Sequence, residues 1–180
     1  MTLREMKLKV LTLIEESDTE QPSLTNDPDI EAKLPYVINQ IIFELARFKK
    51  IPAYIEQDVE ENETLDLSNL DSFYQLQIIR GVDYLPVNET TVKFKEEGTA
   101  EISYYKYPER IDETTEDTYT FELSEDALEI APYGIAADLL KSDVSNSYGE
   151  IYAKRYQEMI SRLDSRYSMP SVYIDGGEAI

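Results

Sequence analysis

The stretch DPDIEAKLPYVINQIIFELARFKK, residues 27–50, decides the fold prediction. It begins with Asp27 and Pro28, an N-cap residue followed by a proline in the first helical position. Apolar side chains then recur at three- and four-residue steps, which is typical of a helix with one buried face. We therefore predict a long helix here. Pro35 lies inside it and is expected to kink the helix or to split off its first turn.

The same spacing predicts three more helices. Thr2 and Glu5 form a capping-box pattern at the start of the first. Ser124 is expected to cap a later helix whose middle is weakened by Pro132. These three helices are predicted over residues 3–16, 124–140 and 148–166.

Between residues 53 and 123 the pattern changes to short runs of β-branched and aromatic residues separated by turn residues, which is typical of strands. Strands are predicted at residues 54–59, 64–67, 74–79, 91–94, 100–107 and 119–123. A helical turn is expected within residues 68–73, a hairpin turn at 96–98 and a loop at 111–118.

The predicted fold class is α+β: mainly an α-helical bundle of about four helices, with a β-strand insertion between the second and third helices and an extended C-terminal tail. Because the insertion interrupts the bundle, the two helix pairs must meet to bury their apolar faces. The expected parts are an N-terminal helix pair (1–52), an acidic β insertion (53–123), a C-terminal helix pair (124–167) and the tail (168–180).

The composition favours a globular protein without a membrane segment. The 180 residues, 42% of them hydrophobic, suit one domain, or one domain with a sizeable insertion. No segment approaches the roughly 20 apolar residues of a membrane span, and the first residues lack a secretory signal pattern. We therefore expect a soluble, unprocessed protein that is synthesised in the cytoplasm and has no membrane partner.

The sequence contains no His and no Cys. It therefore has no Ser-His-Asp or Cys-His relay, and no thiolate or imidazole metal site. P-loop, G-x-G-x-x-G and EF-hand patterns are also missing. Carboxylate pairs can hydrolyse glycosides or hold Mg²⁺, but 37 acidic residues make such pairs inevitable. We expect no enzyme activity, and no catalytic, cofactor-binding or metal-binding residues.

The charge is strongly negative, with 37 acidic and 17 basic residues and a net charge of −20. Residues 53–123 hold 18 acidic and 5 basic residues, a net of −13. Such a surface repels phosphates, so conventional DNA binding is not expected. Three interpretations stay open: solubility and repulsion of wrong partners, a channel wall past which DNA moves without sticking, and mimicry of DNA.

The last predicted helix carries aromatic and basic residues. Tyr148, Tyr152 and Tyr156 stand four residues apart on one face, which suits either core packing or a subunit interface. Arg155 and Arg162 make the same helix locally basic. They either pair with an acidic surface of the next subunit or belong to a solvated face.

Three stretches and their order carry a resemblance to a known family. They are DPDI (27–30) leading into VINQIIFELAR (37–47), ISYYKYP (102–108), and FELSEDALEIAPYGIAADLL (121–140), which the tyrosine-rich helix follows. Together they resemble the head-to-tail adaptor or connector family of tailed bacteriophages, also described as portal adaptors or gatekeepers. The resemblance covers about residues 2–166.

The resemblance implies a subunit of a ring, commonly of twelve, in the virion neck beneath the portal protein. Such a ring extends the DNA channel, lets DNA pass without specific binding, and docks the next neck or tail-completion protein. The tail of such proteins often reaches the portal or a neighbouring subunit. The expected partner-binding residues are therefore Pro170, Val172, Tyr173 and Ile174, with Arg155 and Arg162. The alternative function is an acidic inhibitor or DNA mimic that binds a nucleic-acid enzyme.

Overall fold

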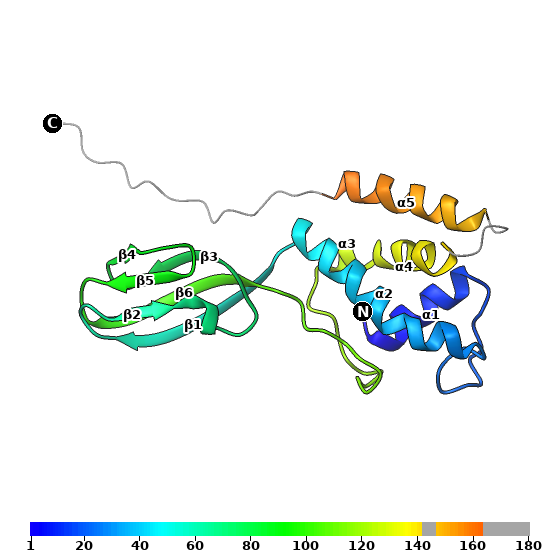
Figure 1. Cartoon of the computed structure of the whole chain (residues 1–180), viewed down its shortest axis with the longest axis horizontal. Helices are drawn as coiled ribbons and strands as arrows, with labels where there is room; N and C mark the ends of the chain where they lie inside the picture. Colours follow the sequence, from blue (N-terminus) through cyan, green and yellow to red (C-terminus); the bar gives the residue numbers. More distant parts are fainter. Residues whose placement is uncertain (142–146, 164–180) are drawn as a thin grey trace.

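The structure is a computed structural model and describes residues 1–141 and 147–163. Helices gather at one end of the molecule and strands at the other (Figure 1). The helices are α1 (Leu3–Leu13), α2 (Pro28–Phe48), α3 (Glu125–Leu128), α4 (Ala131–Leu140) and α5 (Tyr148–Arg162). The strands are β1 (Ile51–Val59), β2 (Thr64–Asp66), β3 (Phe73–Arg80), β4 (Tyr84–Pro86), β5 (Thr91–Phe94) and β6 (Gly98–Lys106), and a short 3-10 turn lies at Leu67–Asn69.

The described strands form two antiparallel sheets of three strands each. Their strand orders are β1-β6-β3 and β2-β5-β4. The longest pairing joins β1 to β6 in unbroken register, from Ile51 opposite Lys106 to Val59 opposite Gly98. We call residues 51–107 the β part.

The β part has a hydrophobic core of its own. Phe94 of one sheet and Ile102 of the other are completely buried. The two sheets therefore pack face to face and exclude water from between them. The core residues are Val59, Leu67, Ile79, Val82, Val92, Phe94, Ala100, Ile102 and Tyr104.

The prediction of a mainly α-helical bundle with one β-strand insertion is wrong. The described residues are 41% helical and 24% strand, and the strands make two sheets. The period-two runs were correctly located along the chain. Together, however, the strands bury one cluster of side chains between the two sheets, so they need no helix to complete a core.

Strand pairing also differs from the prediction around residues 96–98. This bend does not join a hairpin, because β5 pairs with β2 and β4 while β6 pairs with β1 and β3. Strand β4 was not predicted. The strand predicted at residues 119–123 is reduced to one bridge between Thr120 and Thr2, and the Leu3 N–H donates to the Tyr119 carbonyl nearby.

Two helix starts follow the predicted chemistry. The Thr2 hydroxyl accepts a hydrogen bond from the Glu5 N–H and the Glu5 carboxylate accepts one from the Thr2 N–H, so the capping box is confirmed. The Asp27 side chain accepts from the N–H groups of Asp29 and Ile30. Pro35 does not split off the first turn, because α2 runs through it without a break.

The helix predicted over residues 124–140 is instead two helices, α3 and α4. Ser124 stands at the N-cap position of α3, but its side chain makes no capping hydrogen bond to the turn that follows. Pro132 lies in the first turn of α4, where its missing N–H costs nothing. The chain therefore ends one helix and starts another, which avoids a proline in a helix interior.

The apolar side chains of residues 108–123 pack in the core of the helices. Ile111, Phe121 and Leu123 are buried in the same core as α1, α2, α4 and α5. Asp117 accepts hydrogen bonds from Lys7 (2.9 Å) and Arg4 (3.3 Å) of α1. We call the five helices together with residues 108–123 the helical part. In this part, none of the described helices combines the length and apolar character needed to cross a membrane.

The approach of α4 to α5 and α2 depends on the absence of a side chain at Gly134. A Cβ there would lie 2.8 Å from Cε2 of Tyr156 and 3.0 Å from Cδ1 of Ile41. We expect Gly134→Ala to lower the free energy of unfolding by roughly 1–3 kcal/mol, because the packed helices must move apart. Urea unfolding measures the loss, and hydrogen exchange locates it in α2, α4 and α5.

Gly81→Ala is the matched control in the other core. Gly81 has φ +85°, and a Cβ there would lie 2.4 Å from the carbonyl oxygen of Thr99. This variant should lose amide protection in β3 and β6 and keep it in the helices. If both variants lost protection uniformly over the whole chain, the description as two separate cores would be contradicted.

Candidate functional site

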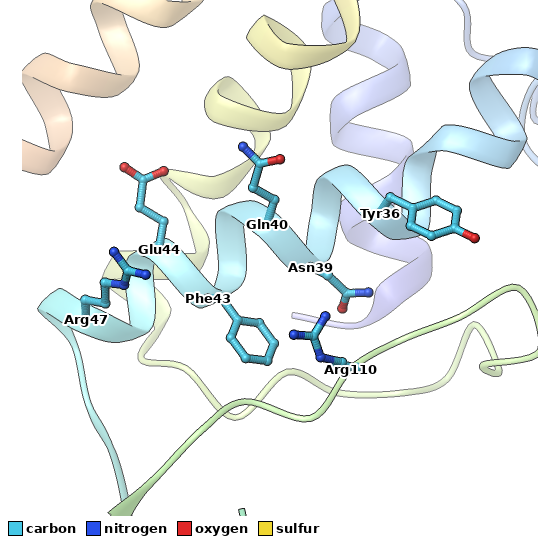
Figure 2. A pocket seen from close by; sticks show the side chains of 7 residues that line it. All are labelled: Tyr36, Asn39, Gln40, Phe43, Glu44, Arg47 and Arg110. Atoms are coloured by element: carbon cyan, nitrogen blue, oxygen red, sulfur yellow. The ribbon is translucent and has the colours of Figure 1, made fainter. Parts of the chain in front are cut away.

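Helix α2 carries two different faces. One holds the buried residues of its stripe: Leu34, Pro35, Ile38, Ile41, Ile42 and Leu45. The other repeats at steps of three and four residues and stays largely outside the core. With Arg110 from the segment that leaves β6, this second face lines a groove of about 520 Å³ (Figure 2). The residues of this α2 groove are Tyr36, Asn39, Gln40, Phe43, Glu44, Arg47 and Arg110.

Arg110 is held in place by its neighbour in the chain. The side-chain amide of Asn39 donates to the Ile111 carbonyl (2.7 Å), and the Ile111 N–H donates to Oδ1 of Asn39 (2.9 Å). The Arg110 guanidinium lies 4.6 Å from the centre of the Phe43 ring, within the range of a cation–π contact. The groove therefore presents a positioned cation over an aromatic ring.

Arg47 and Arg110 have no carboxylate partner within the described part of the chain. The ion pairs there use Arg4, Lys7, Lys9, Lys49 and Lys106. The groove also contains Glu44, but its carboxylate accepts a hydrogen bond from the Tyr156 hydroxyl at 3.1 Å. Two guanidinium groups that form no ion pair within the described residues thus lie on one surface of a strongly acidic chain.

The hydroxyl of Tyr156 keeps its proton at ordinary pH. Burial, together with the charge of Glu44 and the hydrogen bond to it, raises the pKa of Tyr156 well above its usual range. The hydroxyl therefore remains a donor to Glu44, and this bond joins α5 to α2 behind the groove.

Aromatic contacts continue from the groove to the β part. Phe43 stacks on Tyr107 with ring centres 6.1 Å apart, and Tyr107 meets Tyr74 edge-on at 4.9 Å. Lys50 follows, with its ammonium 5.4 Å from the centre of the Tyr74 ring and 5.1 Å from that of Tyr105. These contacts link α2 to β3 and β6 where the chain passes between the two parts.

A second groove, of about 410 Å³, lies between α1 and α4. Its rim charges are already paired, because Lys9 Nζ lies 2.6 Å from the Glu129 carboxylate. Elsewhere, no group of three or more acidic side chains within residues 1–141 and 147–163 is arranged to hold a metal ion. The α2 groove is therefore the surface whose chemistry points most clearly to a partner.

The structure locates some of the residues predicted to bind partners. Arg155 lies on α5 with its guanidinium 4.3 Å from the centre of the Tyr133 ring, and Arg162 is exposed in the last turn of α5. Neither reaches the α2 groove. The predicted residues Pro170, Val172, Tyr173 and Ile174 lie outside the described residues.

The three tyrosines of α5, for which core packing and a subunit interface were both predicted, do not all have the same environment. Tyr156 is buried, and the half-buried Tyr152 donates its hydroxyl to the Leu13 carbonyl at 2.7 Å. Core packing is therefore confirmed for these two. Tyr148 is 55% exposed and stacks on Tyr152 at the edge of the helix.

The groove residues were missed by the sequence analysis, although part of the signal was present. Tyr36, Phe43 and Arg47 stand at steps of seven and four residues on the side of α2 that the apolar stripe leaves free. Arg110 had no local signal, because its place depends on the contact between Asn39 and a distant loop.

Comparison with known proteins adds no relative for this chain. No protein-family model and no curated protein matches its sequence. The resemblance to phage adaptors consequently rests on the quoted stretches and their order alone, and the functions that it implies stay predictions.

Asn39 is the residue whose loss should release Arg110. In Asn39→Ala the half-buried N–H and carbonyl of Ile111 lose their partners, which we expect to cost roughly 1–3 kcal/mol of unfolding free energy. The Ile111 amide should also exchange faster with solvent. Gln40→Ala, which removes an exposed bond to Asp138, is the control and should cost less than about 0.5 kcal/mol. If the exchange rate of the Ile111 amide were unchanged in Asn39→Ala, the two hydrogen bonds between Asn39 and Ile111 would not be what holds Arg110 in place.

Proposed function

We propose that the chain is a non-catalytic structural subunit, a head-to-tail adaptor of a tailed bacteriophage that assembles as a ring beneath the portal protein. In this proposal the ring lies in the virion neck, extends the DNA channel and docks the next neck or tail-completion protein. The observation that carries the proposal is the α2 groove, a cationic and aromatic surface on a chain with a net charge of −20.

The electrostatics explain why this groove matters for assembly. A chain this acidic repels other copies of itself and other acidic proteins at long range. Attraction must therefore come from local contacts in which a cation meets a carboxylate. Arg47 and Arg110 supply two such cations, and the rings of Phe43 and Tyr36 supply apolar area beside them.

The outer face of the β part supports the role as a channel rim. Glu56 of β1 stands directly opposite Glu101 of β6, and Asp58 lies on the same face two residues further along β1. Arg80 of β3 is paired in register with Glu101 on its other side. A mainly acidic face offers DNA phosphates little attraction, so DNA that passes it is not held back.

The proposal is tested by mixing the full chain with the portal protein encoded by the same phage genome. Native mass spectrometry and electron microscopy should show a ring of copies, each of 20.8 kDa, bound to the portal. Twelve copies are expected from the family resemblance. A matched control replaces the portal by an unrelated ring protein of similar size and charge, which should bind none.

Two results would argue against the proposal. One is a chain that stays monomeric and fails to bind the portal. The other is tight, salt-sensitive binding to a nucleic-acid enzyme in competition with DNA, which is the behaviour expected of an acidic inhibitor or DNA mimic.

A further inference from the structure

The α2 groove has the chemistry of a site for a carboxylate-bearing protein segment. Guanidinium groups bind carboxylates through two parallel hydrogen bonds, and they do so best where an apolar surface partly excludes water. Arg47 and Arg110 provide the guanidiniums. Tyr36, which is 71% exposed, and the part of the half-buried Phe43 that lines the groove provide the surface.

A segment of matching charge and shape is present in the chain itself. Residues 112–117 form a protruding loop of the helical part (Figure 1) and contain four acidic residues and no basic one. We call this segment the acidic turn. Its backbone is pinned by Asp112, whose carboxylate accepts from the Thr114 N–H (2.8 Å) and hydroxyl (2.7 Å), while its own N–H donates to the Thr115 hydroxyl (2.9 Å).

The turn presents two exposed carboxylates that form no ion pair within the described residues, although Glu116 also accepts a hydrogen bond from the Thr118 hydroxyl (3.2 Å). Asp117 is occupied by Arg4 and Lys7, but Glu113 and Glu116 are exposed and pair with no cation of the described residues. Because the turn is already ordered by its own hydrogen bonds, it loses little conformational freedom when it binds.

We propose that the acidic turn of one copy docks in the α2 groove of the next copy, with Glu113 and Glu116 facing Arg47 and Arg110. This inference rests on the proposed function, because it names the contact between subunits of the ring. Groove and turn are different surfaces of one chain, so the contact is head-to-tail and each copy keeps one of each free for a further neighbour. Head-to-tail contacts of this kind close into rings when the rotation between copies allows it.

The contact is tested by reversing its charges one side at a time. The groove variant is R47E/R110E, and the turn variant is E113K/E116K. Either variant alone brings like charges together and should associate at least about tenfold more weakly than the original chain, in the presence of the portal. A 1:1 mixture restores both kinds of contact, and it should form rings that contain the two variants in equal numbers, which native mass spectrometry resolves by mass.

Two control variants carry the same changes in charge at other places; of the four positions, three are exposed and Lys93 is half-buried. K93E/K95E, in and after β5, matches the groove variant, and E60K/E61K, between β1 and β2, matches the turn variant. Both should assemble like the original chain. Circular dichroism of all four variants establishes that they are folded before assembly is compared.

Covalent trapping gives a second readout, because the chain has no cysteine of its own. The double variant Tyr36→Cys with Thr114→Cys places one thiol in the groove and one on the turn. Mild oxidation should give a ladder of head-to-tail oligomers on a non-reducing gel, whereas each single variant should give no ladder.

The outcomes separate this contact from the proposed function. Rings on the portal that survive both charge reversals would overturn the contact and leave the adaptor function standing. If the mixed variants associated again but formed only a closed dimer, or had no affinity for portal, the contact would be supported and the adaptor function would be overturned. Failure of the mixture to recover while the original chain assembles would overturn the contact, and a chain that stays monomeric with portal would overturn both.

Discussion

The burial of α2 is the constraint on which the rest of the structure depends. Its apolar stripe is covered by α4, which comes close because Gly134 has no side chain, and by α5 through Tyr156. Once that stripe is buried, the opposite face of α2 must lie outside the core. The position of Phe43 and Arg47 outside the core is therefore a geometric result of how the core is packed, and the same packing fixes the α2 backbone that carries the groove.

Several of the few cations of this chain form ion pairs with carboxylates of residues 108–123. Arg4 and Lys7 pair with Asp117, and Lys106 pairs with Glu122, so the second half of residues 108–123 is joined both to α1 and to β6. Burial alone would raise the pKa of Asp117, but the hydrogen bonds and charges of Lys7 and Arg4 outweigh it and hold the pKa below its usual range. Asp117 thus keeps its negative charge to a lower pH than an ordinary aspartate, and Arg47, which takes no part in these ion pairs, is exposed to solvent.

Features that depend on neighbouring residues were predictable from the sequence. The cap at Asp27, the capping box at Thr2 and the bounds of β5 are examples, because each is decided within one turn or one short run. Strand partners were not predictable, since a period of two gives the buried side of a strand but not the strand that it pairs with. The position of Arg110 was hidden for a related reason: it is set by a contact with Asn39, far away along the chain.

The pairing of Ile51 with Lys106 has a consequence for how such a chain can change over generations. The β part enters and leaves through two residues that face each other across a ladder, about 5 Å apart. An antiparallel segment whose ends meet in the same way, and which keeps Tyr107 on Phe43 and Lys106 on Glu122, fits this gap without disturbing the helices. Evolution can accordingly lengthen, shorten or replace the β part as a unit. The helices that carry the α2 groove need not change when this happens.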